Sequence, residues 1–263
     1  MPANIFRTAK GNITIGELMK KVFTPNGYAL VDAEKSLIPV LKQENPPTCK
    51  QAFEDWERQA EKGISTASNP QLIAVYYATK FHSIKGMNGA VIGSQTPWVE
   101  VLCLANGAES LITVDYQKLH ITHPQIAFIH AMDVVKNREV YNDKFDFIVS
   151  FSSIEHSGLG RYGDPIDPFG DIKEMQKIRC MLKPGGLFFL GLPVGQDNVG
   201  WNCHRTYGRI RLAMMTAGFE VVDIFYMDEE PINLELDMLY KEYYNPHVFI
   251  HYVFVLRKSA PPK

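Results

Sequence analysis

Residues 145–171 join a strand pattern directly to a loop crowded with side chains that can do acid–base chemistry. The first seven residues, FDFIVSF, are mostly apolar, which is typical of a central parallel strand covered on both faces. The glycines and prolines that follow break any regular element. Because ligands of open α/β sheets bind beyond the carboxyl ends of the strands, the segment predicts an active site at a strand end.

Within this loop, His156 is the candidate general base, because imidazole titrates near neutral pH, and Glu155 can orient its ring. We expect Arg161, Tyr162 and Asp164 to contact a substrate or to form part of a lid. Arg161 can clamp a carboxylate or a phosphate through its planar guanidinium. An ion pair between Arg161 and a nearby aspartate would give the same sequence.

A second polar cluster occupies residues 191–211, GLPVGQDNVGWNCHRTYGRIR, after the fifth predicted strand. A doubly wound sheet places this loop on the same edge as Glu155, so we expect the cluster to line an acceptor pocket. Trp201 with Asn202 suits a sugar, because an aromatic face packs on C–H groups while an amide binds hydroxyls; a buried loop anchor is the alternative. His204 and Arg205 complete the predicted acceptor contacts. The acceptor is expected to be a small molecule or a glycan-like compound.

Composition limits the classes of partner. The chain has 263 residues, a formal net charge of −2 and 46% hydrophobic residues, so no global positive field attracts nucleic acid or an anionic membrane. No segment approaches the roughly 18 apolar residues of a membrane span, and the N-terminus lacks an apolar leader. The four cysteines are far apart, and the HxxH of His120 and His123 has no third ligand near it, so we expect free thiols, no metal site and a cytoplasmic protein. The oligomeric state stays open.

The chain is expected to divide near residue 88. Residues 1–88 lack strand alternation and carry helical patterns, which predicts a helical N-terminal extension or cap. From residue 89 to 263, apolar runs alternate with helical segments, which predicts an α/β domain with a mostly parallel sheet and helices on both faces. The runs are residues 90–93, 110–116, 126–133, 145–151, 185–194, 217–228 and 247–258. Too little chain separates the last two for a crossover helix, so the last strand is expected to be antiparallel.

Two acidic residues follow strand patterns on this expected sheet. Asp115 lies 22 positions after Gly93, which ends the first strand pattern. An acid roughly 20 residues beyond such a glycine binds ribose hydroxyls in mononucleotide-binding folds. Asp133 is expected to end the third strand, where a carboxylate can receive an adenine amine. Both can also be simple turn residues, since aspartate is common at strand ends.

The segments ITVDY, AMDV, FDFIVSFSSIEH and MLKPGGLFFLGLP, in this order between residues 90 and 258, resemble a class I S-adenosylmethionine-dependent methyltransferase. The KPGG stretch is the most specific part, and the loop GLGRYGDPIDPFGD looks like an uncharacterised branch of that superfamily. The resemblance implies a Rossmann-like seven-stranded sheet, S-adenosylmethionine as cofactor and methyl transfer as activity. It also implies cofactor contacts at the ends of the first four strands: Gly93, Ser94, Gln95, Asp115, Tyr116, Asp133, Val134, Ser150, Phe151 and Ser152.

The first glycine motif departs from the family pattern. The family has a GxGxG run, whereas this chain reads VIGSQTPWVE and keeps only Gly93. Gln95 and Pro97 replace glycines that let the backbone approach a ligand closely or adopt positive φ. Two hypotheses therefore stay open: an active methyltransferase, or a catalytically inactive relative that serves as a binding or scaffold protein.

Overall fold

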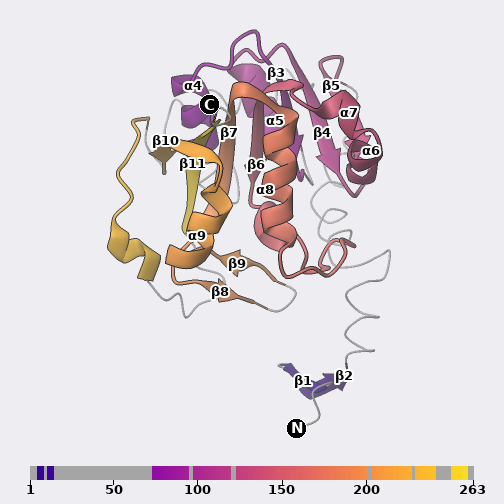
Figure 1. The fold of residues 1–263 in the computed structure, drawn as a ribbon, viewed down its shortest axis with the longest axis vertical. Helices are drawn as coiled ribbons and strands as arrows, with labels where there is room; N and C mark the ends of the chain where they lie inside the picture. Colours follow the sequence, from indigo (N-terminus) through magenta and orange to yellow (C-terminus); the bar gives the residue numbers. More distant parts are fainter. Residues whose placement is uncertain are drawn as a thin grey trace, which may run out of the picture.

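The computed structural model describes residues 5–8, 11–14, 73–94, 97–119, 123–200, 203–226, 229–240 and 250–259. A seven-stranded sheet forms the centre of the described part of the chain (Figure 1). From edge to edge the strands are β10 (Phe219–Phe225), β11 (Ile250–Lys258), β7 (Leu182–Val194), β6 (Phe145–Phe151), β3 (Asn88–Ile92), β4 (Ser110–Asp115) and β5 (Ile126–His130).

Strand β11 runs antiparallel to both of its neighbours, β7 and β10, while the pairs β7–β6, β6–β3, β3–β4 and β4–β5 are parallel. The mostly parallel sheet with an antiparallel last strand, predicted from the apolar runs, is confirmed, as is the Rossmann-like seven-stranded sheet that the resemblance implied. One consequence of this topology matters for the site. An antiparallel strand begins at the edge where its parallel neighbours end, so the first residues of β11 lie beside the last residues of β7.

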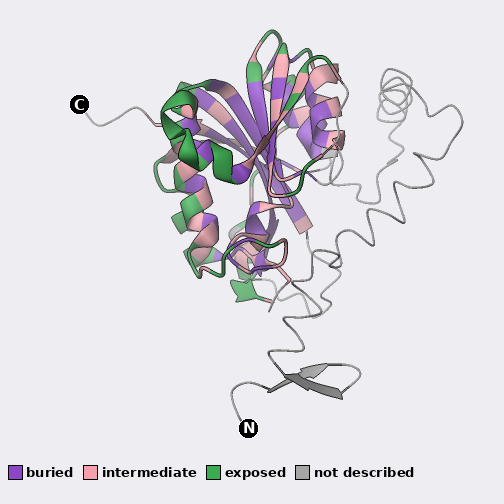
Figure 2. Ribbon diagram, turned by 90° about the vertical axis from the view of Figure 1, so that its right-hand side faces the viewer, coloured by how far each residue is buried: buried purple, intermediate pink, exposed green. Residues whose placement is uncertain are grey.

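Helices cover both faces of the sheet. Helices α4 (Ile73–Phe81) and α5 (Trp98–Ala105) pack on one face, and α6 (Ala131–Lys136), α8 (Gly170–Met181) and α9 (Arg209–Thr216) pack on the other. A short helix, α7 (Arg138–Tyr141), follows α6. Along β6, Ile148 faces the helices α6, α8 and α9, whereas Phe147 and Val149 face α4 and α5. The strand is therefore buried from both sides. Figure 2 shows the buried residues concentrated along the strands.

The loops beyond the strand ends contain short 3₁₀ helices and one short strand pair. A 3₁₀ helix, η2 (Ile154–His156), follows β6, and a second one, η3 (Leu236–Tyr240), precedes β11. The pair β8 (Asn198–Val199) and β9 (Arg205–Thr206) folds the loop after β7 back on itself. A single bridge between Val194 and Tyr207 ties this loop to the end of β7. Strands β7 and β9 therefore meet η2 at one edge of the sheet.

Two expectations need correction here. Residues 1–88 were expected to lack strands, yet β1 (Ile5–Thr8) and β2 (Gly11–Thr14) form an antiparallel pair; four residues a strand are too few for alternation to register. Asp133 does not end the third strand, because β5 stops at His130 and Asp133 lies in α6. Helix α4 is helical as expected, but the remaining cap helices lie outside the described residues, and the boundary after residue 88 stays a prediction.

None of the helices described is long and apolar enough to cross a membrane. Cys103, Cys180 and Cys203 carry free thiols.

Candidate functional site

Asp115 lies where β4 ends, beside the turn that follows β3. The Ser94 amide donates to Oδ2 of Asp115 at 2.9 Å, and the Gln117 amide donates to Oδ1 at 2.7 Å. Burial raises the pKa of Asp115, and these amide donors act in the opposite direction. The Tyr116 amide also acts on this carboxylate, whose two oxygens offer about four acceptor positions, so acceptor capacity remains for a hydroxyl.

Gly93 makes the turn after β3 possible. Its φ is +75°, in the left-handed region, and a Cβ at this position would lie 1.7 Å from Oγ of Ser153. The absence of a side chain lets the turn pack directly against Ser153, the residue that precedes η2. The glycine turn therefore lies next to the short helix that carries Glu155 and His156.

A buried carboxylate on α5 supports this turn, and sequence reasoning missed it. Oε1 of Glu100 accepts from Oγ1 of Thr113 at 2.6 Å, and Oε2 accepts from Oγ of Ser94 at 3.1 Å. The Glu100 side chain has no exposed surface, and its burial raises the pKa to about 7. The signal was present in the sequence, because Glu100 is the one charged residue in the otherwise apolar helix WVEVLCLA.

Glu155 and His156 meet a third residue that sequence reasoning also missed. Nε2 of His251, at the start of β11, lies 3.4 Å from Oε1 of Glu155, and Nε2 of His156 lies 3.7 Å from the same oxygen. The Cys203 carbonyl contacts Nδ1 of His156, and because a carbonyl only accepts, Nδ1 carries the hydrogen. The lone pair of a neutral His156 is therefore on Nε2, the nitrogen nearer Glu155.

The electrostatics of this group follow from its burial. Burial lowers the pKa of His156, although the carboxylate of Glu155 acts to raise it. Burial alone would raise the pKa of Glu155, but His156 and the hydrogen bond from His251 bring it below its usual range. Oε2 of Glu155 is buried without a hydrogen-bond partner among the described residues. At neutral pH the site thus holds an ionised carboxylate beside a neutral imidazole.

Arg161, Tyr162, Cys203 and His204 surround the other side of His156. The Tyr162 ring meets the His156 ring edge to face at 5.3 Å between centroids, and the His204 ring does so at 6.2 Å. The Arg161 guanidinium lies over the Tyr162 ring at 5.5 Å, with Nη1 3.5 Å from the Cys203 carbonyl oxygen. The structure therefore brings together four predicted site residues, His156, Arg161, Tyr162 and His204, from two loops.

Asp164 serves the backbone of its own loop. Its Oδ2 accepts from the amides of Gly158 at 2.7 Å and Gly160 at 3.1 Å, and its Oδ1 accepts from the Tyr162 amide at 3.2 Å. The side chain is buried. These contacts fix the conformation of the loop, so the substrate contact expected for Asp164 has no support in the geometry.

Arg205 is likewise turned inward. Its Nη1 donates to the carbonyls of Ser157 at 2.6 Å and Glu155 at 3.3 Å, and its Nε lies 3.6 Å from a carboxylate oxygen of Asp171. The residue is 1% exposed, which argues against the expected contact with an acceptor. Sequence alone does not tell whether a guanidinium points into the protein or out of it.

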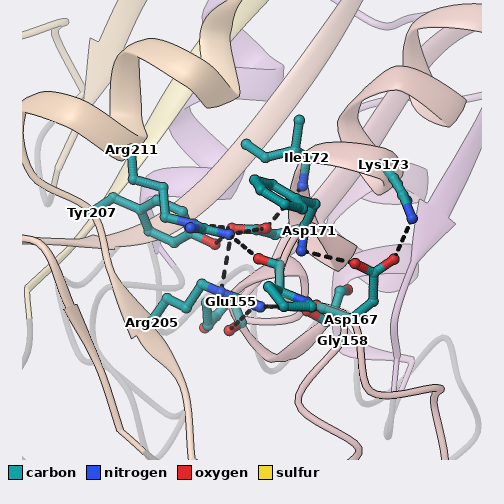
Figure 3. Close-up of polar contacts among 12 residues, drawn as sticks. Glu155, Gly158, Asp167, Asp171, Ile172, Lys173, Arg205, Tyr207 and Arg211 are labelled. Atoms are coloured by element: carbon teal, nitrogen blue, oxygen red, sulfur yellow. Dashed lines mark hydrogen bonds and ion pairs between the residues drawn. The ribbon is translucent and has the colours of Figure 1, made fainter.

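Figure 3 shows Arg205, Tyr207 and Arg211 converging on Asp171. Nε and Nη2 of Arg211 donate to the two Asp171 oxygens at 2.7 and 2.6 Å, and the Tyr207 hydroxyl donates at 3.0 Å. Asp171 is fully buried at the start of α8, so every one of these donors offsets the cost of burying its charge. This network anchors the loop that carries His156.

Three further predicted cofactor residues, Asp133, Val134 and Tyr116, follow strands β4 and β5. Asp133 is exposed and lies 3.3 Å from Nζ of Lys136, and Val134 is buried in the core. Tyr116 is half-buried beside the His130 ring, and burial raises its pKa to about 12. The geometry thus supports the acid at the end of β4 better than the acid expected after β5.

Three residues end strand β6. Oγ of Ser150 donates to the Ile92 carbonyl at 3.0 Å and links β6 to β3, and Phe151 packs edge to face on Trp98 and stacks on His251. Ser152 adopts a φ of +49°, which is uncommon for a residue other than glycine and marks an abrupt end of the strand. Gln95, Trp201 and Asn202 lie outside the described residues. No group of three or more metal-ligating side chains occurs among the residues that the structure describes.

The model of the family described as Caenorhabditis protein of unknown function, DUF268, matches residues 86–259. A search of curated proteins finds no match. Among solved structures, the Burkholderia thailandensis 1,6-didemethyltoxoflavin-N1-methyltransferase, with bound 1,6-didemethyltoxoflavin and S-adenosylhomocysteine, is similar with a TM-score of 0.53 and 14% identity, over 83% of this chain and 92% of that one. The N-methyltransferase NodS from Bradyrhizobium japonicum WM9, in complex with S-adenosylhomocysteine, has a TM-score of 0.46 and 15% identity, over 87% and 99%. The first likeness supports the fold.

The buried carboxyl of Glu100 makes stability depend on pH. Its folded pKa of about 7 lies above the ordinary 4.5, so the folded state keeps a proton that the unfolded chain releases. The proton on Glu100 stabilises the folded state fully below the unfolded pKa of 4.5, and this stabilisation is lost as pH rises through the folded pKa of about 7. The free energy of unfolding should fall by up to about 3 kcal/mol over this range. Glu100→Gln should abolish this part of the pH dependence. Urea unfolding of both proteins at pH 4.5, 6 and 8 measures it; an equal difference between them at all three values would contradict the assignment.

Gly93→Ala should destabilise the fold by more than its backbone conformation alone requires. Positive φ costs an alanine about 1 kcal/mol, and at Gly93 the added Cβ also collides with Ser153. Gly86→Ala is the matched control, because Gly86 has a φ of +73° and no atom within 4 Å of the added carbon. Thermal unfolding of both variants checks this, and the Gly93→Ala, Ser153→Ala double variant should recover part of the loss. Equal losses of thermal stability in Gly93→Ala and Gly86→Ala would show that the contact with Ser153 adds nothing to the cost.

Proposed function

The chain belongs to the DUF268 family, and we propose that it is an S-adenosylmethionine-dependent methyltransferase that acts on a small-molecule or glycan-like acceptor. The observation that carries the proposal is the meeting of Gly93, Asp115 and His156 at one edge of the sheet, through the contact of the glycine turn with Ser153. Ligands of open α/β sheets bind at this edge. The methyltransferase fold of the described residues is consistent with it.

The residues fit the ribose end of such a cofactor. Asp115 ends β4 and accepts amide hydrogen bonds on both oxygens, and its remaining acceptor capacity suits a ribose hydroxyl. Gly93 forms the turn beside it, and Ser94, Tyr116 and Ser152 border the same strand ends. Gln95, Asp133, Val134, Ser150 and Phe151 stay proposed cofactor contacts from the resemblance. When bound, S-adenosylmethionine supplies an electrophilic methyl group on a sulfonium sulfur.

The chain's own chemical task is to hold the acceptor and to remove its proton. A neutral His156 has its lone pair on Nε2, and a proton accepted there faces the ionised carboxylate of Glu155. His251 orients that carboxylate from the other side. Tyr162, Arg161 and His204 lie around His156 and are the proposed acceptor contacts, with Trp201 and Asn202 added from the sequence.

Isothermal titration calorimetry with S-adenosylhomocysteine tests the cofactor proposal. We expect binding to the wild-type chain and a loss of about tenfold or more in affinity for Asp115→Ala, because hydrogen bonds to a charged group contribute about 1.5–3 kcal/mol. Asp133→Ala tests the adenine contact separately, and Glu109→Gln, at an exposed acid next to β4, is the matched control.

Absence of binding to the wild-type chain would favour the inactive binding or scaffold protein instead. Binding that Asp115→Ala leaves unchanged would remove Asp115 from the ribose site.

His156→Asn should abolish methyl transfer while leaving the affinity for S-adenosylhomocysteine unchanged. The reason is that His156 takes the acceptor proton and has no assigned contact with the cofactor. Transfer of a labelled methyl group to a panel of hydroxyl- and amine-bearing small molecules and glycans measures the activity, with calorimetry on the same variant as the control. Retained turnover would exclude His156 as the base.

A further inference from the structure

Arg161 is a half-buried cation near His156 in the candidate site. Nη1 lies 3.5 Å from the Cys203 carbonyl oxygen, a long contact, and the guanidinium faces the Tyr162 ring. Both neighbours also contact His156, Cys203 through its carbonyl and Tyr162 through its ring. The charge of Arg161 therefore lies directly beside the proposed base.

The nearby acids are occupied by other groups. Asp164 accepts three backbone amides, and Asp167 pairs with Nζ of Lys173 at 2.5 Å. Glu155 faces His156 and His251. Among the described residues no carboxylate forms an ion pair with Arg161, so the internal ion pair that the sequence left open is not formed.

The two other buried or half-buried arginines of this region differ in this respect. Arg205 and Arg211 both lie against Asp171 and donate to loop carbonyls. Their charges are compensated inside the protein, as buried guanidinium groups require. Arg161 has one long contact with a loop carbonyl and no such carboxylate among the described residues.

Other donors point to the same place. Burial raises the pKa of Tyr162, so its hydroxyl stays protonated near neutral pH and can donate beside the guanidinium. Burial also lowers the pKa values of His156 and His204, with the charge of Arg161 acting in the same direction. At neutral pH the cluster around His156 thus holds one fixed cation, a phenol donor and two neutral imidazoles, with the ionised carboxylate of Glu155 beside His156.

We propose that Arg161, with the Tyr162 hydroxyl, binds a carboxylate or phosphate group of the acceptor, so that the acceptor is an anion whose nucleophile is held at His156. The inference rests on the proposed methyl transfer and narrows its substrate class. A planar guanidinium matches both oxyanions in a two-point contact. Uronic acids, aromatic acids and phosphate esters share this chemistry, whereas a neutral sugar offers Arg161 no ion-pair partner.

The experiment observes His156 directly and needs neither methyl donor nor known acceptor. The full chain, labelled with ¹³C at histidine Cε1, is titrated from pH 5 to 8 by NMR, alone and with benzoate, inorganic phosphate or the neutral isostere benzamide; His156→Asn assigns the signal. An anion bound to Arg161 offsets the positive charge beside His156 and should raise its titration midpoint. Glu155, His251 and His204 also face this ring and are present in every sample; the charge of Arg161 acts on His204 as well, so its signal should move in the same direction.

Benzoate, phosphate or both should shift the His156 midpoint, and benzamide should not; the anion that binds identifies the acceptor as a carboxylate or a phosphate. Arg161→Gln should weaken the anion about tenfold or more, since a charge-assisted contact is lost. Arg138→Gln, at an exposed arginine of α7, should leave it unchanged. Arg161→Lys should retain part of the binding, because the charge remains without the planar fork.

The proposal is overturned when neither anion moves the midpoint, or when each moves it equally in wild type and Arg161→Gln. Because no methyl donor is present, this failure is distinct from a failure to bind S-adenosylhomocysteine. Failure of the anions to shift the His156 midpoint would exclude an anionic acceptor and would not touch the proposed methyl transfer. Failure to bind S-adenosylhomocysteine would exclude the cofactor and would not touch the anion site.

Discussion

The candidate site depends on a buried guanidinium. Residues 152–169 contain only the short helix η2, so the loop has few repeating hydrogen bonds to hold its shape. Arg205 replaces them by donating to carbonyls of Glu155, Ser157 and Asp167, three points along the loop. Its own charge is balanced by Asp171 at the start of α8. Breaking a buried pair of this kind costs about 3–5 kcal/mol, because it leaves a charge without a partner.

The same loop meets the rest of the sheet where Gly93 faces Ser153. On one side of this contact, Ser94 joins Asp115 to Glu100. On the other side, Glu155 joins η2 to the beginning of β11 through His251. These contacts thus join the ends of β3, β4 and β6 to the start of β11 through polar groups, most of which are buried.

Sequence reasoning found what periodicity and local order encode. The buried strands read as apolar runs, and Asp115 stood where its run ended, so the sheet and one site residue followed directly. Asp133 misled because the apolar run continued through His130 into α6, and a helix that starts without a glycine or proline leaves no break in the pattern. His251 was missed because it lies 96 positions from Glu155, and only the antiparallel direction of β11 brings its first residues to the carboxyl edge. Arg161 and Arg205 are the same residue type in similar polar loops, but Arg205 is buried against Asp171 and Arg161 is half-buried without an ion pair among the described residues. Tertiary contacts decide this difference.

Two buried carboxylates, Asp171 and Glu155, have different kinds of partner. This difference explains how one loop can be held rigidly and still carry a proton acceptor. A carboxylate at the site has to be either neutralised from within, as Asp171 is, or left ionised in a setting where its field acts on a neighbour. Glu155 belongs to the second kind, because its neighbours are imidazoles, which take up or release protons near neutral pH, whereas arginines do not. Arginines in place of these imidazoles would hold the charge of Glu155 in a permanent ion pair and would leave its neighbours unable to take up a proton at neutral pH. The placement of permanent cations on Asp171 and titratable rings on Glu155 is therefore what separates the anchor of this loop from its chemistry.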